Sequence, residues 1–203
     1  PDKSGILIFG RNSEKLSLDL AKNPTIVQGF EMKEKDCEPY LGMKFSKGGP
    51  SDCITKTLET KKMRCMVIAA QLEQELEDDI VMGVGWLATT SLVFEAKLVS
   101  TLMYSCEAWI GMTKQQQSYL EAIQRQCLYK VLGISNRSNY RNLLSILKIA
   151  PAIDMMKKMK ITFLNFLIHV KNKGICLETI KGDKSNGDIV GLIDEVRGYC
   201  EEY

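Results

Sequence analysis

The side chains that could do chemistry in this sequence are mainly cations, and they are concentrated in one stretch. Residues 137–173 carry eight lysines and arginines against a single aspartate, Asp154. The eight cations are Arg137, Arg141, Lys148, Lys157, Lys158, Lys160, Lys171 and Lys173. Cations gathered on neighbouring predicted helices are typical of a surface that binds a polyanion. A solvated basic face without a partner has the same composition, so charge alone leaves both interpretations open.

The remaining reactive residue types form no pattern that indicates hydrolytic, redox or metal chemistry. Seven cysteines are scattered without a CxxC pair, and His169 is the one histidine. We interpret the cysteines as reduced packing thiols of an intracellular protein, and we do not expect a zinc site. His169 follows Phe163 and Phe166 in an apolar segment, so we expect a core or boundary histidine rather than a ligand.

Length and composition place limits on the fold. A chain of 203 residues suits one large domain or two small ones. The apolar run 80–94 is bounded by charges and is too short to cross a bilayer, so we expect it in the core. The opening "PDKSGILIF" resembles the middle of a domain rather than a natural start, and we expect the chain to be a fragment.

The elements that position these residues change character along the chain. β-branched and aromatic runs predict strands over residues 4–10, 25–32 and 40–45, with the last two pairing as an antiparallel hairpin. From Ser51 onward the apolar residues recur at helical spacing, and Ser51 or Asp52 is the expected N-cap. The later helices are predicted over about 92–104, 113–133, 139–147, 151–173 and 188–197. The predicted class is α+β: a small antiparallel β piece followed by a mainly α-helical bundle.

Four short motifs occur in this order: "KSGILIF" (Lys3–Phe9), "YLGM" (Tyr40–Met43), "STLMYSCEAW" (Ser100–Trp109) and "LEAIQRQCLYKVLGIS" (Leu120–Ser135). Together they resemble the C-terminal part of reverse transcriptases encoded by non-LTR (LINE-type) retrotransposons. The resemblance implies that residues 1–50 are the end of the palm, with its Tyr-Leu-Gly hairpin. Residues 51–173 would be the thumb and following helices. Residues 174–203 do not resemble the family, and their own pattern indicates a linker and a C-terminal helix.

The family's catalytic aspartates lie before the Lys-Ser segment, so this span is not expected to catalyse polymerisation alone. Two-metal phosphoryl transfer needs convergent carboxylates, and Asp78-Asp79 lacks the family's aromatic-alanine turn. The resemblance therefore implies Mg²⁺ in the parent enzyme and none bound by this span. The implied partners are an RNA–DNA hybrid, or an RNA template with a DNA primer, and the rest of the parent polymerase, in the nucleus or cytoplasm and without a membrane.

The resemblance also assigns roles to individual residues. Tyr40, Leu41 and Gly42 would form the primer grip, where glycine permits close approach to the sugar-phosphate backbone. The alternative is that Gly42 marks a bulge in an ordinary strand and Tyr40 packs with its hydroxyl at the surface. Lys3 would lie near the incoming nucleotide as a cationic catalytic group, or else be a surface lysine.

The predicted phosphate contacts are cations of the helical part, which would bind without reading base sequence. They are Lys56, Lys61, Lys62, Arg64, Arg137, Arg141, Lys157, Lys158 and Lys160. Tyr104, Glu107 and Trp109 are expected to pack in the core. Ser105-Cys106 stands where the family has Gly-x, which puts a close backbone approach there in doubt. A function of another class remains open, namely a non-enzymatic helical protein-interaction module derived from a retrotransposon.

Overall fold

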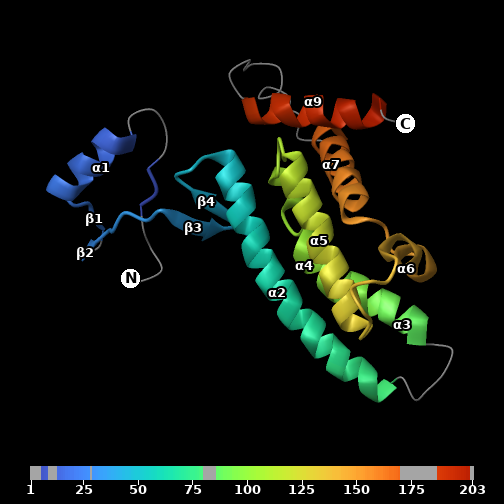
Figure 1. Cartoon of the computed structure of the whole chain (residues 1–203). Coiled ribbons are helices and arrows are strands. Elements are labelled where there is room, and N and C mark those ends of the chain that lie inside the picture. The colour runs from blue at the N-terminus through green and yellow to red at the C-terminus, as the bar shows by residue number, and fades with distance from the viewer. Residues whose placement is uncertain (1–5, 9–12, 28, 80–85, 170–186, 202–203) are drawn as a thin grey trace. The chain divides into compact units, whose positions relative to one another are not determined.

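The computed structural model describes residues 6–8, 13–27, 29–79, 86–169 and 187–201. This part of the chain is mainly helical, with small antiparallel two-stranded sheets near the N-terminus (Figure 1). The predicted α+β class is confirmed. The chain divides into two compact units, Pro1–Thr57 and Leu58–Tyr203, and the boundary falls inside a helix.

The N-terminal unit begins with a helix that the sequence analysis did not predict, α1 (Ser13–Lys22). The predicted strand over 25–32 is wrong as a single strand. Two short strands, β1 (Ile26–Val27) and β2 (Phe30–Glu31), pair antiparallel there, because Gly29 has a φ of 82° and lets the chain reverse. Of the predicted strand over 4–10, residues 6–8 are described, and Ile6 makes an isolated bridge to Glu34.

The second hairpin of this unit carries the Tyr-Leu-Gly motif. Strand β3 (Cys37–Tyr40) pairs antiparallel with β4 (Met43–Ser46), in a register that runs from Cys37 opposite Ser46 to Tyr40 opposite Met43. The predicted pairing of 25–32 with 40–45 is therefore wrong. The sequence places the motif in one strand, whereas the structure places it at a turn between two.

Helix α2 (Pro50–Asp79) follows and crosses from one unit into the next. The Gly49 carbonyl accepts the first helical bond, from Cys53 N at 3.0 Å, so Pro50 takes a first-turn position instead of Ser51 or Asp52 forming the cap. The predicted apolar face of this helix is confirmed. Its buried members are Ile54, Leu58, Cys65, Ala69, Leu72 and Leu76.

The next part of the helical unit is one helical stretch that contains a wider, π-helical turn. Helix α3 (Trp86–Val93) passes into the π-helical segment η2 (Phe94–Val99) and then into α4 (Ser100–Met103). A short 3₁₀ turn, η3 (Cys106–Ala108), leads on to the next helix. These elements agree with the helix predicted around 92–104.

Local capping signals place the next two helices as predicted. Thr113 and Gln116 form a reciprocal capping box at the start of α5 (Lys114–Val131). Gly133, at a φ of 61°, ends that helix in a Schellman arrangement, in which Ile134 N donates to Tyr129 O at 3.1 Å. Asn139 caps α6 (Tyr140–Leu147) by accepting from Asn142 N.

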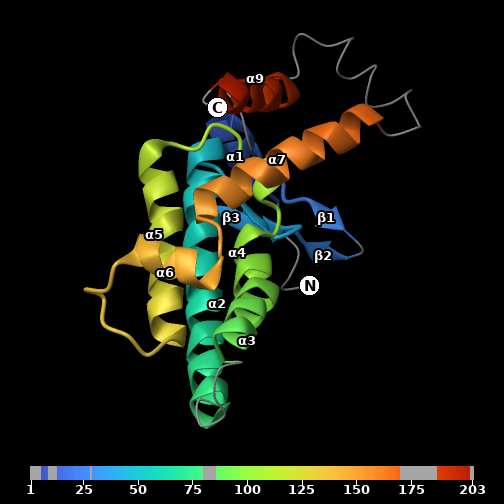
Figure 2. The same cartoon turned by 90° about the vertical axis from the view of Figure 1, so that its right-hand side faces the viewer.

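The core of the helical unit forms around α2, α5 and the α3–α4 stretch. Figure 2 shows α2 between α5 on one side and α3 and α4 on the other. The thiol of Cys127 on α5 lies 3.9 Å from the Met66 sulfur on α2, and the Cys65 thiol approaches the Leu98 carbonyl of η2 at 4.0 Å. Phe94 and Leu102 are buried from the same stretch.

Two further helices pack on this core. Helix α7 (Ala152–His169) contacts α5 and η3, and α9 (Gly187–Glu201) packs on α7. A separate apolar cluster joins the last two helices through Leu164, Leu192, Val196 and Tyr199. Helix α9 confirms the helix predicted around 188–197.

Candidate nucleic-acid interface

The turn between β3 and β4 is built from residues in an unusual backbone conformation. Leu41 and Gly42 have φ values of 46° and 83°. Two consecutive positive φ values in a two-residue hairpin are those of a type I′ turn, which favours Asn, Asp or Gly at its first position. A leucine at that position is strained, because its side chain crowds the backbone in the left-handed region.

The strained turn presents an apolar tip to solvent. Leu41 is 69% exposed and Tyr40 is 65% exposed. The Tyr40 ring meets Phe45 on the facing strand edge-on, with the ring centroids 6.2 Å apart. The tip therefore offers a leucine and an aromatic ring that face away from the unit's own core.

The hairpin is tied to the start of α2 within the same unit. Lys44 N donates to Thr57 Oγ1 at 2.8 Å, and Ser46 N donates to Cys53 Sγ at 3.1 Å. Ser46 is itself buried. These bonds hold β4 against the first two turns of the helix, so the tip projects from an anchored strand.

Lys56, a predicted phosphate contact, takes part in this attachment. Its ammonium donates to Ser46 Oγ at 2.6 Å and pairs with Asp52 Oδ2 at 2.8 Å. Hydrogen bonds from Lys56 and Ser46 hold the pKa of the Asp52 carboxyl below its usual value, and Asp52 in turn raises the pKa of Lys56. The ammonium of Lys56 is therefore already engaged within the unit. Its contact with nucleic acid stays a prediction.

The prediction for Lys61 is wrong, because Lys61 is buried in the helical unit. Its ammonium donates to Thr101 O at 2.9 Å and to Tyr104 O at 2.8 Å. It also lies 5.5 Å from the Trp109 ring centroid, and the residue is 5% exposed. Burial lowers the pKa of Lys61 to about 8. Such a lysine is engaged inside the helical unit and offers no charge to a phosphate.

Lys160 is also buried, so its predicted role is wrong for the same reason. The residue is 0% exposed and donates to Trp109 O at 2.6 Å and to Glu195 Oε1 at 2.7 Å. Its neighbour Lys157 is half-buried, with its ammonium 4.9 Å from the Tyr199 ring centroid. Helical spacing alone does not show which member of a lysine run faces inward.

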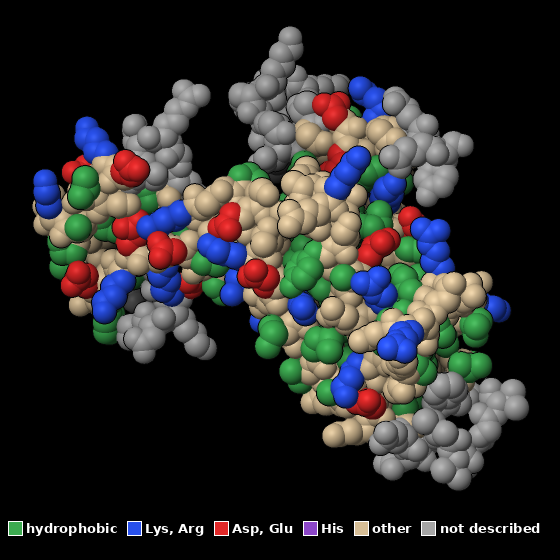
Figure 3. Space-filling model, viewed as in Figure 1, with side chains coloured by type: hydrophobic (Ala, Val, Ile, Leu, Met, Phe, Trp, Pro, Cys, Tyr) green, Lys and Arg blue, Asp and Glu red, His purple; other side chains and the backbone are tan. Residues whose placement is uncertain are grey.

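The other predicted cations of the helical unit reach the surface to different degrees. Lys62 is half-buried, with its ammonium 5.5 Å from the Tyr119 ring centroid. The exposed ones are Arg64, Arg137, Arg141 and Lys158. Figure 3 shows the lysines and arginines in view scattered among neutral and apolar side chains rather than merged into one field.

The helical unit has a hollow with a polar lining, and two of the predicted arginines are sequence neighbours of its lining residues. A hollow of about 540 Å³ between α5 and the start of α6 is lined by Arg125, Gln126, Tyr129, Asn136, Ser138 and Tyr140. Arg137 and Arg141 directly adjoin lining residues in the sequence, and both are exposed. Exposed arginines beside neutral donors suit a phosphate backbone.

Arg125 is the cation of this hollow that the sequence analysis missed. It lies four residues before Tyr129 on α5, so both side chains lie on one helix face. This four-residue spacing is the signal that could have identified Arg125. A count of net charge does not identify it, because Arg125 lies outside the strongly basic segment.

The "STLMYSCEAW" segment behaves partly as expected. Trp109 is 0% exposed and confirms the predicted core packing, whereas Tyr104 is 57% exposed and does not. Ser105 has a φ of 64°, in the left-handed region that favours glycine. Glycine would adopt this backbone conformation more readily than the serine that stands here. Lys3 and the His169 side chain lie outside the described residues.

Two kinds of feature are absent from the part of the chain that the structure describes, a metal-binding cluster and a membrane-spanning helix. Among these residues there is no group of three or more His, Cys, Asp or Glu side chains placed to hold a metal ion. In the same part of the chain, no helix has the length and apolar character needed to span a bilayer.

Comparison with known proteins gives no match. No protein-family model matches the chain, and it has no significant similarity to a curated protein or to a solved structure.

Proposed function

We propose that this chain is the palm end and thumb of an RNA-directed DNA polymerase of the non-LTR retrotransposon type. In this role it holds a template–primer duplex through sugar-phosphate contacts. The four motifs and their order support the proposal. The catalytic aspartates and the Mg²⁺ that they bind would belong to other residues of the parent polymerase, which would act inside the cell.

The observation that carries the proposal is the strained, exposed tip of the β3–β4 hairpin. A turn that only reverses the chain would be more stable with Asn or Asp in place of Leu41. Backbone strain at an exposed apolar residue is a reason to infer a binding role. Leu41 and Tyr40 would lie against the sugars of the primer strand, and Gly42 would let the backbone approach the phosphates.

The polar hollow on α5 and α6 supplies the second group of contacts. Arg125, Arg137 and Arg141 would bind phosphate oxygens, and neutral donors such as Asn136 would orient them. None of these contacts reads a base edge, so the binding would be indifferent to sequence. A polymerase must move along every template, and it needs this indifference.

Fluorescence anisotropy with a labelled RNA–DNA hybrid and the full chain tests the proposal. The logarithm of the binding constant should fall linearly with the logarithm of salt concentration, because each phosphate contact releases counterions. Hybrids of the same length and different sequence should bind within about twofold of one another. No binding at low salt, or tight binding that survives high salt, would contradict the proposal.

Single arginine variants locate the contacts. Arg137→Gln should weaken binding to all sequences equally and reduce the salt slope by about one. The matched control is Arg197→Gln on α9, an exposed arginine that pairs with Asp194 at 3.7 Å. Equal effects of the two changes would show that the attraction is general and does not depend on Arg137.

A further inference from the structure

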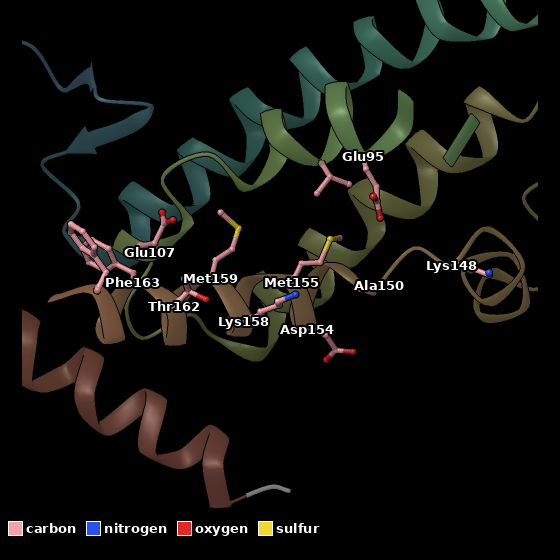
Figure 4. A pocket seen from close by; sticks show the side chains of 12 residues that line it. Glu95, Glu107, Lys148, Ala150, Asp154, Met155, Lys158, Met159, Thr162 and Phe163 are labelled. Carbon is pink, nitrogen blue, oxygen red and sulfur yellow. The ribbon is translucent and has the colours of Figure 1, made fainter. Parts of the chain in front are cut away.

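A second hollow of the helical unit is lined mainly by apolar side chains. This groove, of about 770 Å³, lies between α7 on one side and η2 and η3 on the other. Figure 4 shows Met155 and Met159 of α7 at its centre, with Phe163 at one end. Its lining includes Val99 of η2. Of the cations predicted from the sequence to contact phosphates, Lys158 alone lines this groove.

The apolar lining follows one stripe of α7. Met155, Met159, Phe163 and Phe166 recur at spacings of four, four and three residues, which places them on one face of the helix. At the rise of an α-helix the stripe is about 16 Å long, or three turns. Phe163 is 36% exposed and Phe166 is 62% exposed. The stripe has the length and spacing that a second helix needs to pack along it.

Carboxylates line the side of the groove opposite α7. Glu95 comes from η2 and Glu107 from η3, and Figure 4 shows the two methionines between them and Lys158. Neither carboxylate has an ion-pair or hydrogen-bond partner among the described residues. Asp154, Lys158 and Lys148 also line the groove, so its charged lining consists of three carboxylates and two lysines. The unbalanced charge of the groove is therefore negative.

The π-helical segment η2 supports a binding role for the same groove. A π turn interrupts regular helical hydrogen bonding, and such turns occur frequently at functional sites. Glu95 and Val99 both belong to η2 and both line the groove. The wider turn changes the direction of the helix face that carries these two side chains.

We propose that this groove binds a basic amphipathic helix of a partner protein. The partner's apolar residues would pack on the methionines and Phe163, and a lysine or arginine would lie against Glu95 and Glu107. Methionine side chains adapt to partners of different shape, which suits a protein-docking groove. Unpaired carboxylates repel a phosphate backbone, so the groove does not suit nucleic acid.

A set of three synthetic peptides tests the charge and the pattern together. The probe is a labelled peptide of about 18 residues with leucines at i, i+4, i+7 and i+11 and lysines on the flanking positions. The second peptide replaces the lysines with glutamates, and the third has the composition of the first in scrambled order. Anisotropy with the full chain should show the first binding at least about tenfold more tightly than either of the others.

Variants of the chain locate the site. Glu95→Lys with Glu107→Lys, and separately Phe166→Asp, should each weaken the first peptide about tenfold or more. The matched control is Leu92→Asp, which replaces an exposed leucine of α3 (68% exposed) that does not line the groove. Thermal unfolding followed by circular dichroism verifies that each variant folds.

Several outcomes would overturn the proposal. Equal binding of all three peptides, no binding of the first, or full binding by the Glu95→Lys/Glu107→Lys variant would each do so. Displacement of the peptide by an RNA–DNA hybrid would assign the groove to nucleic acid instead. Self-association that Phe166→Asp abolishes would assign it to a second copy of the chain. Because the test uses no nucleic acid for its main readout, its failure leaves the proposed function standing.

Discussion

At the scale of single residues, two strained backbone positions have different explanations. Leu41 and Ser105 both have positive φ, at 46° and 64°. Leu41 is exposed, and the proposed contact with nucleic acid would explain its strain. Ser105 is half-buried, and its hydroxyl has no hydrogen-bond partner among the described residues. Nothing in its surroundings compensates for the strain.

Ser105→Gly should therefore stabilise the protein. Glycine adopts the left-handed conformation without strain and removes an unpaired hydroxyl, so we expect a gain of about 1 kcal/mol in the free energy of unfolding. Urea denaturation measures it. Ser118→Gly, at an exposed position inside α5, is the control and should lose about 1 kcal/mol. A loss of similar size at both positions would contradict this account of Ser105.

The buried lysine Lys61 should make stability depend on pH. An unfolded chain keeps this proton up to the ordinary lysine pKa of 10.5, whereas burial lowers the pKa in the folded protein to about 8. Between these values the unfolded state binds more protons, so the free energy of unfolding rises with pH. Below about 8 the lysine is charged in both states and this gain is absent.

Lys61→Met isolates the effect, since methionine fills a similar space and does not titrate. Relative to this variant, the wild type should gain up to about 3 kcal/mol in unfolding free energy as the pH rises from about 8 to about 10.5. Urea melts in the presence of a reductant measure the difference at each pH. A difference that is constant over this range would show that Lys61 keeps its ordinary pKa.

At the scale of elements, we expect the turn of the β3–β4 hairpin to lower the stability of the protein and to strengthen its binding to the hybrid. Leu41→Asn relieves the type I′ turn and should raise the unfolding free energy by about 1 kcal/mol, while it weakens hybrid binding. Ile26→Asn, on the exposed strand β1, is the control and should improve neither quantity. Binding that is unchanged in Leu41→Asn would remove the hairpin tip from the interface.

The connection from α4 to α5 is held by lysines from two helices. Lys61 of α2 binds the carbonyls of Thr101 and Tyr104, and Lys160 of α7 binds that of Trp109. Lys160 also reaches Glu195, to which Tyr199 donates a hydrogen bond, so the same contact fastens α9. These polar contacts fix the segment on which Glu107 of the groove is carried.

Lys160→Met should consequently destabilise the helical unit. It removes the ammonium that pairs with the Glu195 carboxylate and donates to the Trp109 carbonyl, a loss of about 3 kcal/mol. Lys158→Met, two residues earlier and exposed, is the control and should change stability by less than about 0.5 kcal/mol. Thermal and urea unfolding compare the two variants, and equal stability would show that the buried pair contributes nothing.

Local signals in the sequence predicted α5 and α6, whereas α1 was not predicted and the expected N-cap of α2 was wrong. The capping residues Thr113, Asn139 and Gly133 act through hydrogen bonds to neighbouring backbone, so short patterns reveal them. The strands were misplaced because each pairs through a tight turn, and Gly29 and Gly42 were interpreted as residues inside strands. Hairpin register depends on the turn, and strand propensity does not reveal it.

The candidate site was predictable only in part. The Tyr-Leu-Gly motif and the exposed arginines were identified from the sequence. The burial of Lys61 and Lys160 was not, because it depends on carbonyls that lie 40 and 51 residues away in the chain. The groove on α7 was also missed, since its carboxylates come from η2 and η3 and meet the methionines only in the folded unit.

At the scale of the whole molecule, binding must come from local groups because the total charge is small. The formal net charge is +2, and Lys61 and Lys160, two of the nine predicted phosphate contacts, are buried. In the proposed function the contacts with a duplex are the apolar hairpin tip of one unit and the exposed arginines of the other. In the further proposal the groove on α7 binds a protein partner instead.

Site-specific crosslinking from position 41 tests the central claim most directly. A photoreactive benzoylphenylalanine replaces Leu41 in one variant of the full chain and the exposed Val27 of the other hairpin in a second. Under irradiation at low salt with a labelled RNA–DNA hybrid, position 41 should crosslink to the nucleic acid, high salt should abolish the crosslink, and position 27 should give little. No crosslink from position 41 while the hybrid is bound, or equal crosslinking from both positions, would contradict the account.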